Sequence, residues 1–251
     1  MKLSKLKALL PLSLSVVAVI AAQQAQAGEF TLGAGVYTSK SEYKGFKDES
    51  GAMPLIEYQG EGWSVGASGL TVDLYENEQS PLSVSAVLSS EGNGFEDDDS
   101  DAFTGMKKRK SSIDLGLQME YEVGPGAIEA SLLADVSSAH KGYVFDMNYS
   151  QSMPVMGGFF QPSAGFEILS EDFTDYYYGV KASEATATRA AYKADTAINP
   201  YLAYSFVYPV NDKLKVVHGS SIKKLDSDIK DSSIVDRSTT WNTFIGLGYT
   251  F

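Results

Sequence analysis

Histidine and cysteine are the usual carriers of catalysis and metal binding, and this chain of 251 residues has two histidines and no cysteine. A catalytic histidine needs a nucleophile and an orienting acid, and a zinc site needs several nitrogen or sulfur ligands. His140 lies in Ala-His-Lys-Gly, which is typical of a turn, and His218 continues the alternation of Leu214 and Val216 near a strand end. No G-x-S-x-G motif occurs. The sequence therefore predicts no catalytic, metal or cofactor site, and a protein that is not an enzyme.

Carboxylates are the most frequent polar groups in the alternating segments described below. Those predicted to face a lumen are Asp114, Glu120, Glu122, Glu129 and Asp135. They either form salt bridges with Lys213 and Lys215, which share the inward register, or line a pore that favours cations. A barrel of about 12 strands encloses a narrow lumen that side chains can fill. We therefore favour a filled or very narrow interior over an open channel.

Two charged runs lie next to each other in the middle of the chain. The acidic run Glu96–Asp101 offers oxygen ligands of the kind that calcium binds, but its order does not fit an EF-hand loop, so a solvated loop is favoured. The basic run follows as Lys107, Lys108, Arg109 and Lys110. It either neutralises the acidic run or contacts the phosphates of lipopolysaccharide at the outer-leaflet rim.

The first 27 residues have the pattern of an export signal. Three lysines precede residue 8, an apolar run covers residues 8–22, and Ala25-Gln26-Ala27 is a small-residue cleavage site. The apolar run is shorter than the roughly 20 residues that a spanning helix needs. We expect residues 1–27 to be a cleaved signal peptide and residues 28–251 to be the exported domain.

Net charge and hydropathy narrow the remaining classes. The chain carries a net charge of −12, so nucleic acid is an unsuitable partner, because phosphate binding needs a basic surface. No stretch after the leader reaches 18 apolar residues, so no spanning helix is expected. Membrane strands remain compatible with this composition, because their outward side chains are apolar and their inward ones polar.

Apolar and polar residues alternate with a period of two along residues 28–251, which indicates β-strands. The clearest segment has Ile113, Leu115, Leu117, Met119 and Tyr121 on one face. Similar segments cover residues 82–88, 128–136, 143–149, 160–168, 198–208 and 241–251. Many are longer than ordinary strands, aromatic residues cluster near their ends, and the chain ends on Phe251. These features favour a transmembrane antiparallel β-barrel over a soluble sandwich.

Short turns alternate with long polar loops, so we expect an even number of strands with both termini in the periplasm. The alternation changes phase at Ser68-Gly69. Either a glycine bulge lies there, which leaves ten or eleven strands, or two short strands meet at a tight turn, which makes twelve. We prefer twelve.

Three groups of residues resemble the MltA-interacting protein (MipA)/OmpV family of outer-membrane proteins. They are Gly33–Tyr37 with Tyr43-Lys44-Gly45, Pro54 and Tyr58; Asp175–Val180 with Glu184-Ala185 and Tyr192; and Asp231–Val235 with Gly246–Phe251. The sequence departs from the family at Ser233, where proline is more usual, and in the acidic run Glu96–Asp101.

The resemblance implies an outer-membrane barrel without catalytic residues. The founding member is described as a scaffold that holds a lytic transglycosylase and a penicillin-binding murein synthase together, and other members are porin-like or adhesive. Two functions follow as expectations. One is a scaffold to which a periplasmic murein hydrolase or synthase binds, and the other is a narrow porin for small solutes or an adhesin-like protein. Outer-membrane lipid and lipopolysaccharide are the expected surroundings.

Overall fold

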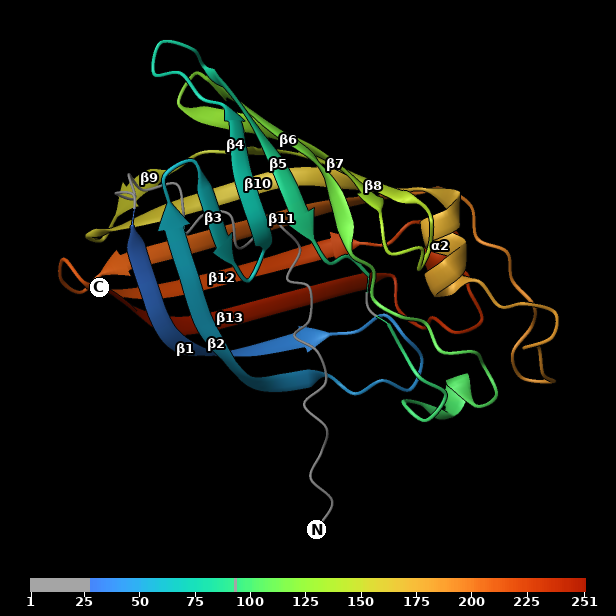
Figure 1. Cartoon of the computed structure of the whole chain (residues 1–251). Coiled ribbons are helices and arrows are strands. Elements are labelled where there is room, and N and C mark those ends of the chain that lie inside the picture. Colours follow the sequence, from blue (N-terminus) through green and yellow to red (C-terminus); the bar gives the residue numbers. More distant parts are fainter. Residues whose placement is uncertain (1–27, 93) are drawn as a thin grey trace.

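Antiparallel strands account for most of the computed structural model, which describes residues 28–92 and 94–251 (Figure 1). The predicted signal peptide, residues 1–27, lies outside the described residues. The strands are β1 (Glu29–Lys40), β2 (Glu49–Gly60), β3 (Trp63–Gly66), β4 (Gly69–Tyr75), β5 (Leu82–Ser89), β6 (Asp114–Val123), β7 (Gly126–Asp135), β8 (Tyr143–Ser150), β9 (Met153–Val155), β10 (Gly158–Leu169), β11 (Ala197–Pro209), β12 (Leu214–Lys224) and β13 (Thr239–Thr250).

The strands close into a barrel because the first and last members of the sheet are both paired. β1 pairs with β13, and β10 pairs with β11, so the sheet returns to its start. β8 and β9 both pair with β10, at its two ends, and together form one interrupted strand. The fold is therefore a closed antiparallel barrel of 12 strands, as the sequence predicts.

The phase change at Ser68-Gly69 is a tight turn between two short strands. β3 pairs with β4 from Trp63 opposite Val72 to Gly66 opposite Gly69. Gly69 has a φ of +116°, and a Cβ there would lie 2.2 Å from the carbonyl oxygen of Leu88. Only glycine fits such a close approach of two backbones, so this residue sets the turn that makes the strand number even.

Side chains alternate between the lumen and the outer surface as predicted. On β6 the outward side chains of Leu115, Leu117 and Met119 are about half exposed, at 48–50%, whereas the inward Asp114 is fully buried. Large apolar side chains are exposed in this way on most of the strands. In water such a belt would be unfavourable, but in a bilayer it faces hydrocarbon. Among the described residues, no helix has the length and hydropathy needed to cross a membrane.

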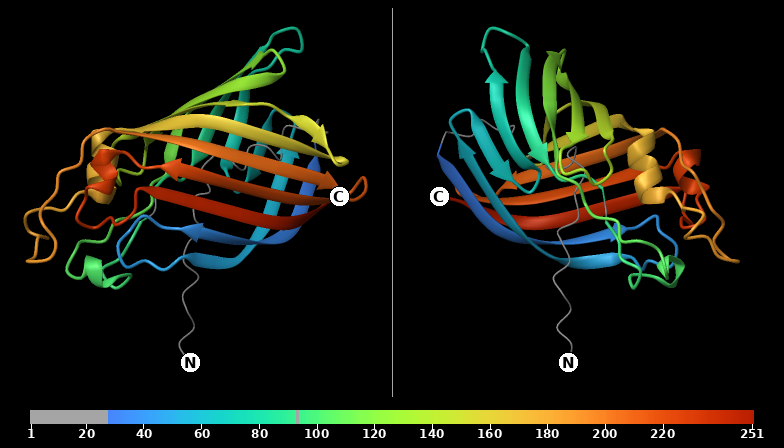
Figure 2. Two further views of the ribbon diagram at one scale, coloured as in Figure 1. Left: turned by 180° about the vertical axis from the view of Figure 1, so that it is seen from behind. Right: turned by 45° about the vertical axis from the view of Figure 1, so that its right-hand side comes forward.

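The two ends of the barrel differ in the length of their connections (Figures 1 and 2). The terminus end carries Gly28, Phe251 and short turns such as residues 61–62, 124–125 and 210–213. The loop end carries residues 90–113, 170–196 and 225–238, with a 3-10 helix η2 (Asp101–Phe103) and helices α2 (Glu171–Tyr178) and α3 (Ser227–Lys230). That the terminus end faces the periplasm stays a prediction.

The loops at the loop end pack together into a cap with its own hydrophobic core. Tyr43, Phe95, Phe103, Tyr177 and Ile229 come from four different connections and are all nearly fully buried. The rings of Phe95 and Phe103 stack with centroids 4.1 Å apart, and Tyr43 meets both rings edge-on. The connections at this end therefore form an ordered layer over the barrel mouth.

Candidate functional site

A cavity of about 330 Å³ lies in the lumen at the terminus end. Its walls come from β1 to β7 on one side and from β12 and β13 on the other. None of its lining residues belongs to the cap core. The cavity is therefore a chamber below the cap.

Acidic side chains dominate the charge of this lumen chamber. Glu57, Asp73, Glu76, Glu120 and Glu129 line it, and Lys215 is its one basic lining residue among the described residues. Gln118 donates a hydrogen bond from its Nε2 to Glu129 Oε2 at 2.9 Å. None of the ion pairs formed within residues 28–92 and 94–251 includes any of these five acids. The chamber therefore carries a negative charge that is only partly balanced.

One wall of the lumen chamber is apolar although it faces inward. Met53 and Leu55 on β2, Val217 on β12 and Phe244 on β13 line it. Met53, Val217 and Phe244 are more than nine-tenths buried and belong to one packed cluster. The chamber therefore combines an apolar wall with an acidic one.

The structure places the five predicted lumen acids in three different surroundings. Glu120 and Glu129 line the chamber, whereas Asp114 and Asp135 lie at the loop end of β6 and β7. Glu122 is exposed near the terminus end and does not line the chamber. No direct ion pair links the chamber acids to Lys215, and Lys213 lies in a turn, where its Nζ is 5.8 Å from the Tyr249 ring centroid.

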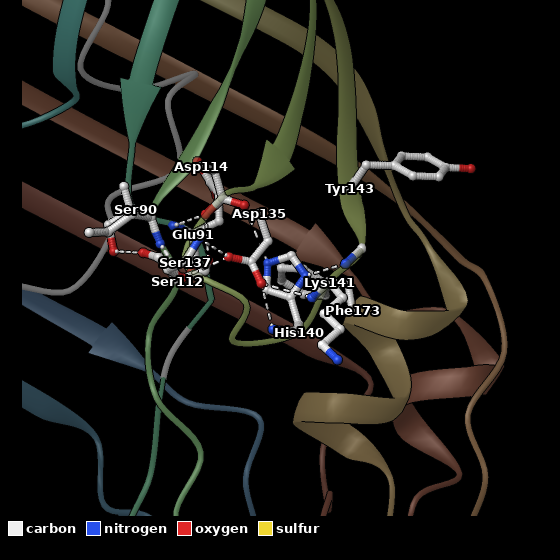
Figure 3. Close-up of polar contacts among 12 residues, drawn as sticks. Ser90, Glu91, Ser112, Asp114, Asp135, Ser137, His140, Lys141, Tyr143 and Phe173 are labelled. Carbon is white, nitrogen blue, oxygen red and sulfur yellow. Dashed lines mark hydrogen bonds and ion pairs between the residues drawn. The ribbon is translucent and has the colours of Figure 1, made fainter.

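Asp114 and His140 form a buried polar pair where the cap joins the barrel (Figure 3). Asp114 Oδ2 accepts hydrogen bonds from Ser112 Oγ and from the backbone N–H of Glu91. Its Oδ1 lies 3.3 Å from His140 Nε2, and both side chains are fully buried. The ring of His140 packs against Phe173 of α2 with centroids 4.7 Å apart. The pair therefore ties β6, the turn before β8 and the cap together.

Asp135 also approaches Asp114 and His140, so these three residues have the composition of a metal site. However, Nδ1 of His140 accepts a hydrogen bond from the Gly142 N–H, which places the ring proton on Nε2 and leaves that atom no lone pair for a metal. Both oxygens of Asp135 accept hydrogen bonds from backbone N–H groups of its own turn. The geometry is that of a structural polar cluster.

Glu91 lies beside this cluster, is half-buried and is a weaker acid than an exposed glutamate. Burial, reinforced by the negative charge of Asp114, raises the pKa of Glu91 to about 8. Ser89 donates a hydrogen bond to its Oε1 at 3.2 Å. The carboxyl is therefore protonated and uncharged near neutral pH.

The four side chains of the basic run do not form one exposed surface. Arg109 is only 4% exposed, and its guanidinium binds both carboxylate oxygens of Glu184, at 3.2 and 3.0 Å. It is thus enclosed in the cap and unavailable to a lipid phosphate. Lys107, Lys108 and Lys110 are exposed, and Lys108 forms an ion pair with Glu96 of the acidic run.

Glu184 is a residue whose role the sequence does not reveal. Burial alone would raise its pKa, but hydrogen bonds from Arg109 and from the backbone N–H groups of Lys107 and Lys181 hold it at about 2. Arg109 also donates from its Nε to the Tyr176 carbonyl at 2.6 Å. The pair links two long loops, and 75 residues of sequence separate its members.

Comparison with known proteins agrees with the barrel and its location. Residues 32–251 match the family model described as MltA-interacting protein MipA. The chain belongs to the MipA family. The outer membrane protein OmpV of Vibrio cholerae serotype O1 is 31% identical over 224 residues, which cover 89% of this chain and 87% of that protein. The MltA-interacting protein of Escherichia coli strain K12 is 28% identical over 242 residues, which cover 96% and 97%.

This MipA family member is therefore an outer-membrane β-barrel. The named relatives are outer-membrane and interaction proteins rather than enzymes. The backbones of solved outer-membrane proteins superpose on it with low TM-scores. OprB of Pseudomonas putida has a TM-score of 0.39 and 10% identity, with 89% of this chain and 94% of that chain covered.

Proposed function

We propose that this protein is a scaffold of the outer membrane that binds a periplasmic murein hydrolase or synthase, rather than a channel for solutes. The observation that carries the proposal is the cap. Its core draws side chains from the four longest connections of the loop end, so that end of the lumen is covered by packed side chains. A barrel closed in this way transmits no steady flow, but it offers a rigid surface.

Hydrogen bonds from charged side chains stabilise the cap in addition to its hydrophobic packing. Arg189 donates hydrogen bonds to the carbonyl oxygens of Ala102, Thr104 and Glu184. Together with the Arg109–Glu184 pair, these bonds connect the loop after β5 to the loop after β10. Several buried charge-assisted hydrogen bonds make spontaneous opening costly.

The terminus end supplies the proposed binding surface. Apolar side chains are exposed there, among them Met156 at 90%, Phe251 at 65% and Val210 at 48%. Exposed aromatic and methionine side chains are common in protein interfaces. One relative is named for its interaction with MltA, and a partner of that kind is what we propose for this chain. The proposal places the terminus end in the periplasm.

Two measurements on the same purified protein test the scaffold. In planar bilayers the protein should show no steady ion current. Immobilised protein should retain a purified murein hydrolase or synthase, and the double variant Met156→Ser/Val210→Ser should retain at least tenfold less. Val136→Ser, a similar change at the loop end, is the control and should leave binding unchanged. A steady current together with absent binding would refute the scaffold and favour the narrow channel.

We also propose that the exposed lysines of the basic run contact lipopolysaccharide. Lys107, Lys108 and Lys110 remain free of burial, and an ammonium group binds phosphate as a compact point charge. Changing the three lysines to glutamine should lower the amount of lipopolysaccharide that co-purifies with the barrel. An unchanged amount would mean that the lysines only balance the acidic run. A cysteine at Ser100 should react with an impermeant reagent on intact cells, which tests the orientation.

A further inference from the structure

The wall of the barrel is incompletely paired between β2 and β4. β2 pairs with β1 along most of its length, but its other edge meets β3 only at Tyr58, Gln59 and Gly60. Within the described residues, the rest of that edge has no neighbouring strand. In Figure 1, β12 and β13 are seen through the space between β2 and β5. Because the β3–β4 hairpin is short, most of this edge of β2 is left without a hydrogen-bonded neighbour in the described part of the chain.

The lumen chamber extends to the barrel wall at this place. Most of its lining residues point inward, but Ile56 of β2 and Val65 of β3 also line it. These two side chains point outward and are 52% and 42% exposed. Both residues lie where β2 meets β3, beside the unpaired edge of β2. The lumen chamber therefore borders the wall at the side where β2 has no neighbouring strand among the described residues.

We propose that the lumen chamber binds a cationic amphiphile that enters from the bilayer over the β3–β4 turn. Its apolar chain packs on Met53, Val217 and Phe244, and its cationic head lies among the chamber glutamates. The volume of about 330 Å³ is at the lower end of the range of small-molecule sites, roughly 300–1,000 Å³, so a single short-chain molecule fits. This inference does not depend on whether a murein enzyme binds elsewhere.

The chemistry of the two walls selects the ligand class. Water hydrates an apolar wall poorly, so contact with an apolar ligand stabilises this wall. Five carboxylates outside any of the ion pairs of the described residues attract a cation, and an anionic head group would be repelled by them. A neutral amphiphile gains the apolar contact alone. A cationic amphiphile gains both, and it is the only one of the three classes that the chamber favours on both walls.

Binding is measured on the barrel in nanodiscs of phosphatidylcholine, with a spin-labelled decyl quaternary ammonium as the probe. The wild type should show an immobilised population in its spectrum, and unlabelled decyltrimethylammonium should displace it. Decyl maltoside and decyl sulfate should displace it at least tenfold less well. Equal displacement by all three compounds would overturn the charge selection, and the absence of an immobilised population would overturn the site.

Matched variants separate the chamber from general electrostatics. Glu57→Gln/Glu120→Gln should weaken binding at least tenfold. Glu122→Gln removes the same charge from the same strand as Glu120 but outside the chamber, and it should change binding less than twofold. Val217→Thr makes the apolar wall polar at constant shape and should weaken binding several-fold. Equal losses in the Glu57→Gln/Glu120→Gln double variant and in the Glu122→Gln variant would overturn the proposal. A heat-modifiable gel shift verifies that each variant is folded, and Val217→Thr alone decides if the double variant does not fold.

Discussion

Replacement of Arg109 by methionine should remove the main charged contact inside the cap while keeping the length of the side chain. Arg109 and Glu184 are almost completely buried, with side-chain exposures of 4% and 2%. The change leaves a buried carboxylate without its cation, which typically costs about 3–5 kcal/mol. The N–H groups of Lys107 and Lys181 still bind that carboxylate, so we expect a value near the lower limit, about 3 kcal/mol.

The assay is urea unfolding of the barrel in lipid vesicles, extended to a double-mutant cycle. Glu184→Gln should also destabilise the protein, because it removes the anion beside a buried guanidinium. The combination Arg109→Met/Glu184→Gln should cost less than the sum of the single changes by at least about 2 kcal/mol, since the two groups are in direct contact. The cycle therefore measures the coupling between the two loops directly.

The pH dependence supplies a second readout of the same pair. Glu184 has a pKa of about 2, below its ordinary value of 4.5. Its contribution to stability is therefore fully present above pH 4.5 and is lost as the pH falls through about 2. The difference in stability between the wild type and Glu184→Gln should shrink over that range. Additive single changes, each below about 1 kcal/mol as for an exposed pair, would refute the reasoning.

Three further predictions concern the barrel, the cluster beneath the cap and the leader. Leu117→Arg directs a charge at lipid and should lower the free energy of unfolding by about 2–4 kcal/mol. Gln118→Arg points into the acidic chamber and should lower it far less. Equal urea midpoints for the two variants would mean that these side chains are assigned to the wrong faces of β6. The protein should lose stability as the pH rises from about 4.5 to about 8, because the half-buried Glu91 stays protonated in the folded state while its unfolded form ionises. Glu91→Gln should remove that loss, and a Glu91→Gln variant with the wild-type pH profile contradicts the prediction. N-terminal sequencing of the mature protein should begin at Gly28, and retention of the leader would exclude cleavage.

The sequence by itself determined the barrel, because membrane strands obey a local rule. Each side chain on β6 faces lipid or lumen according to its parity, so Leu115 and Asp114 could be assigned to opposite faces without knowledge of the rest of the molecule. The phase change at Gly69 was also a local signal. It left a glycine bulge and two short strands as alternatives, and the expected even number of strands favoured the two short strands that the structure has. The family resemblance extends over the same residues and agrees with the model match to residues 32–251.

Only the tertiary structure decided what the polar residues do. Parity placed Asp114 and Glu120 on one inward face, but Asp114 lies under the cap beside His140, while Glu120 lines the open chamber. Arg109 looked like part of an exposed basic run, and its burial depends on Glu184, far away in the sequence. Such contacts arise from loops that fold onto one another. No periodicity encodes the partner of a loop residue, so the cap, the apolar wall of the chamber and the unpaired edge of β2 became apparent only once the strands were closed into a ring.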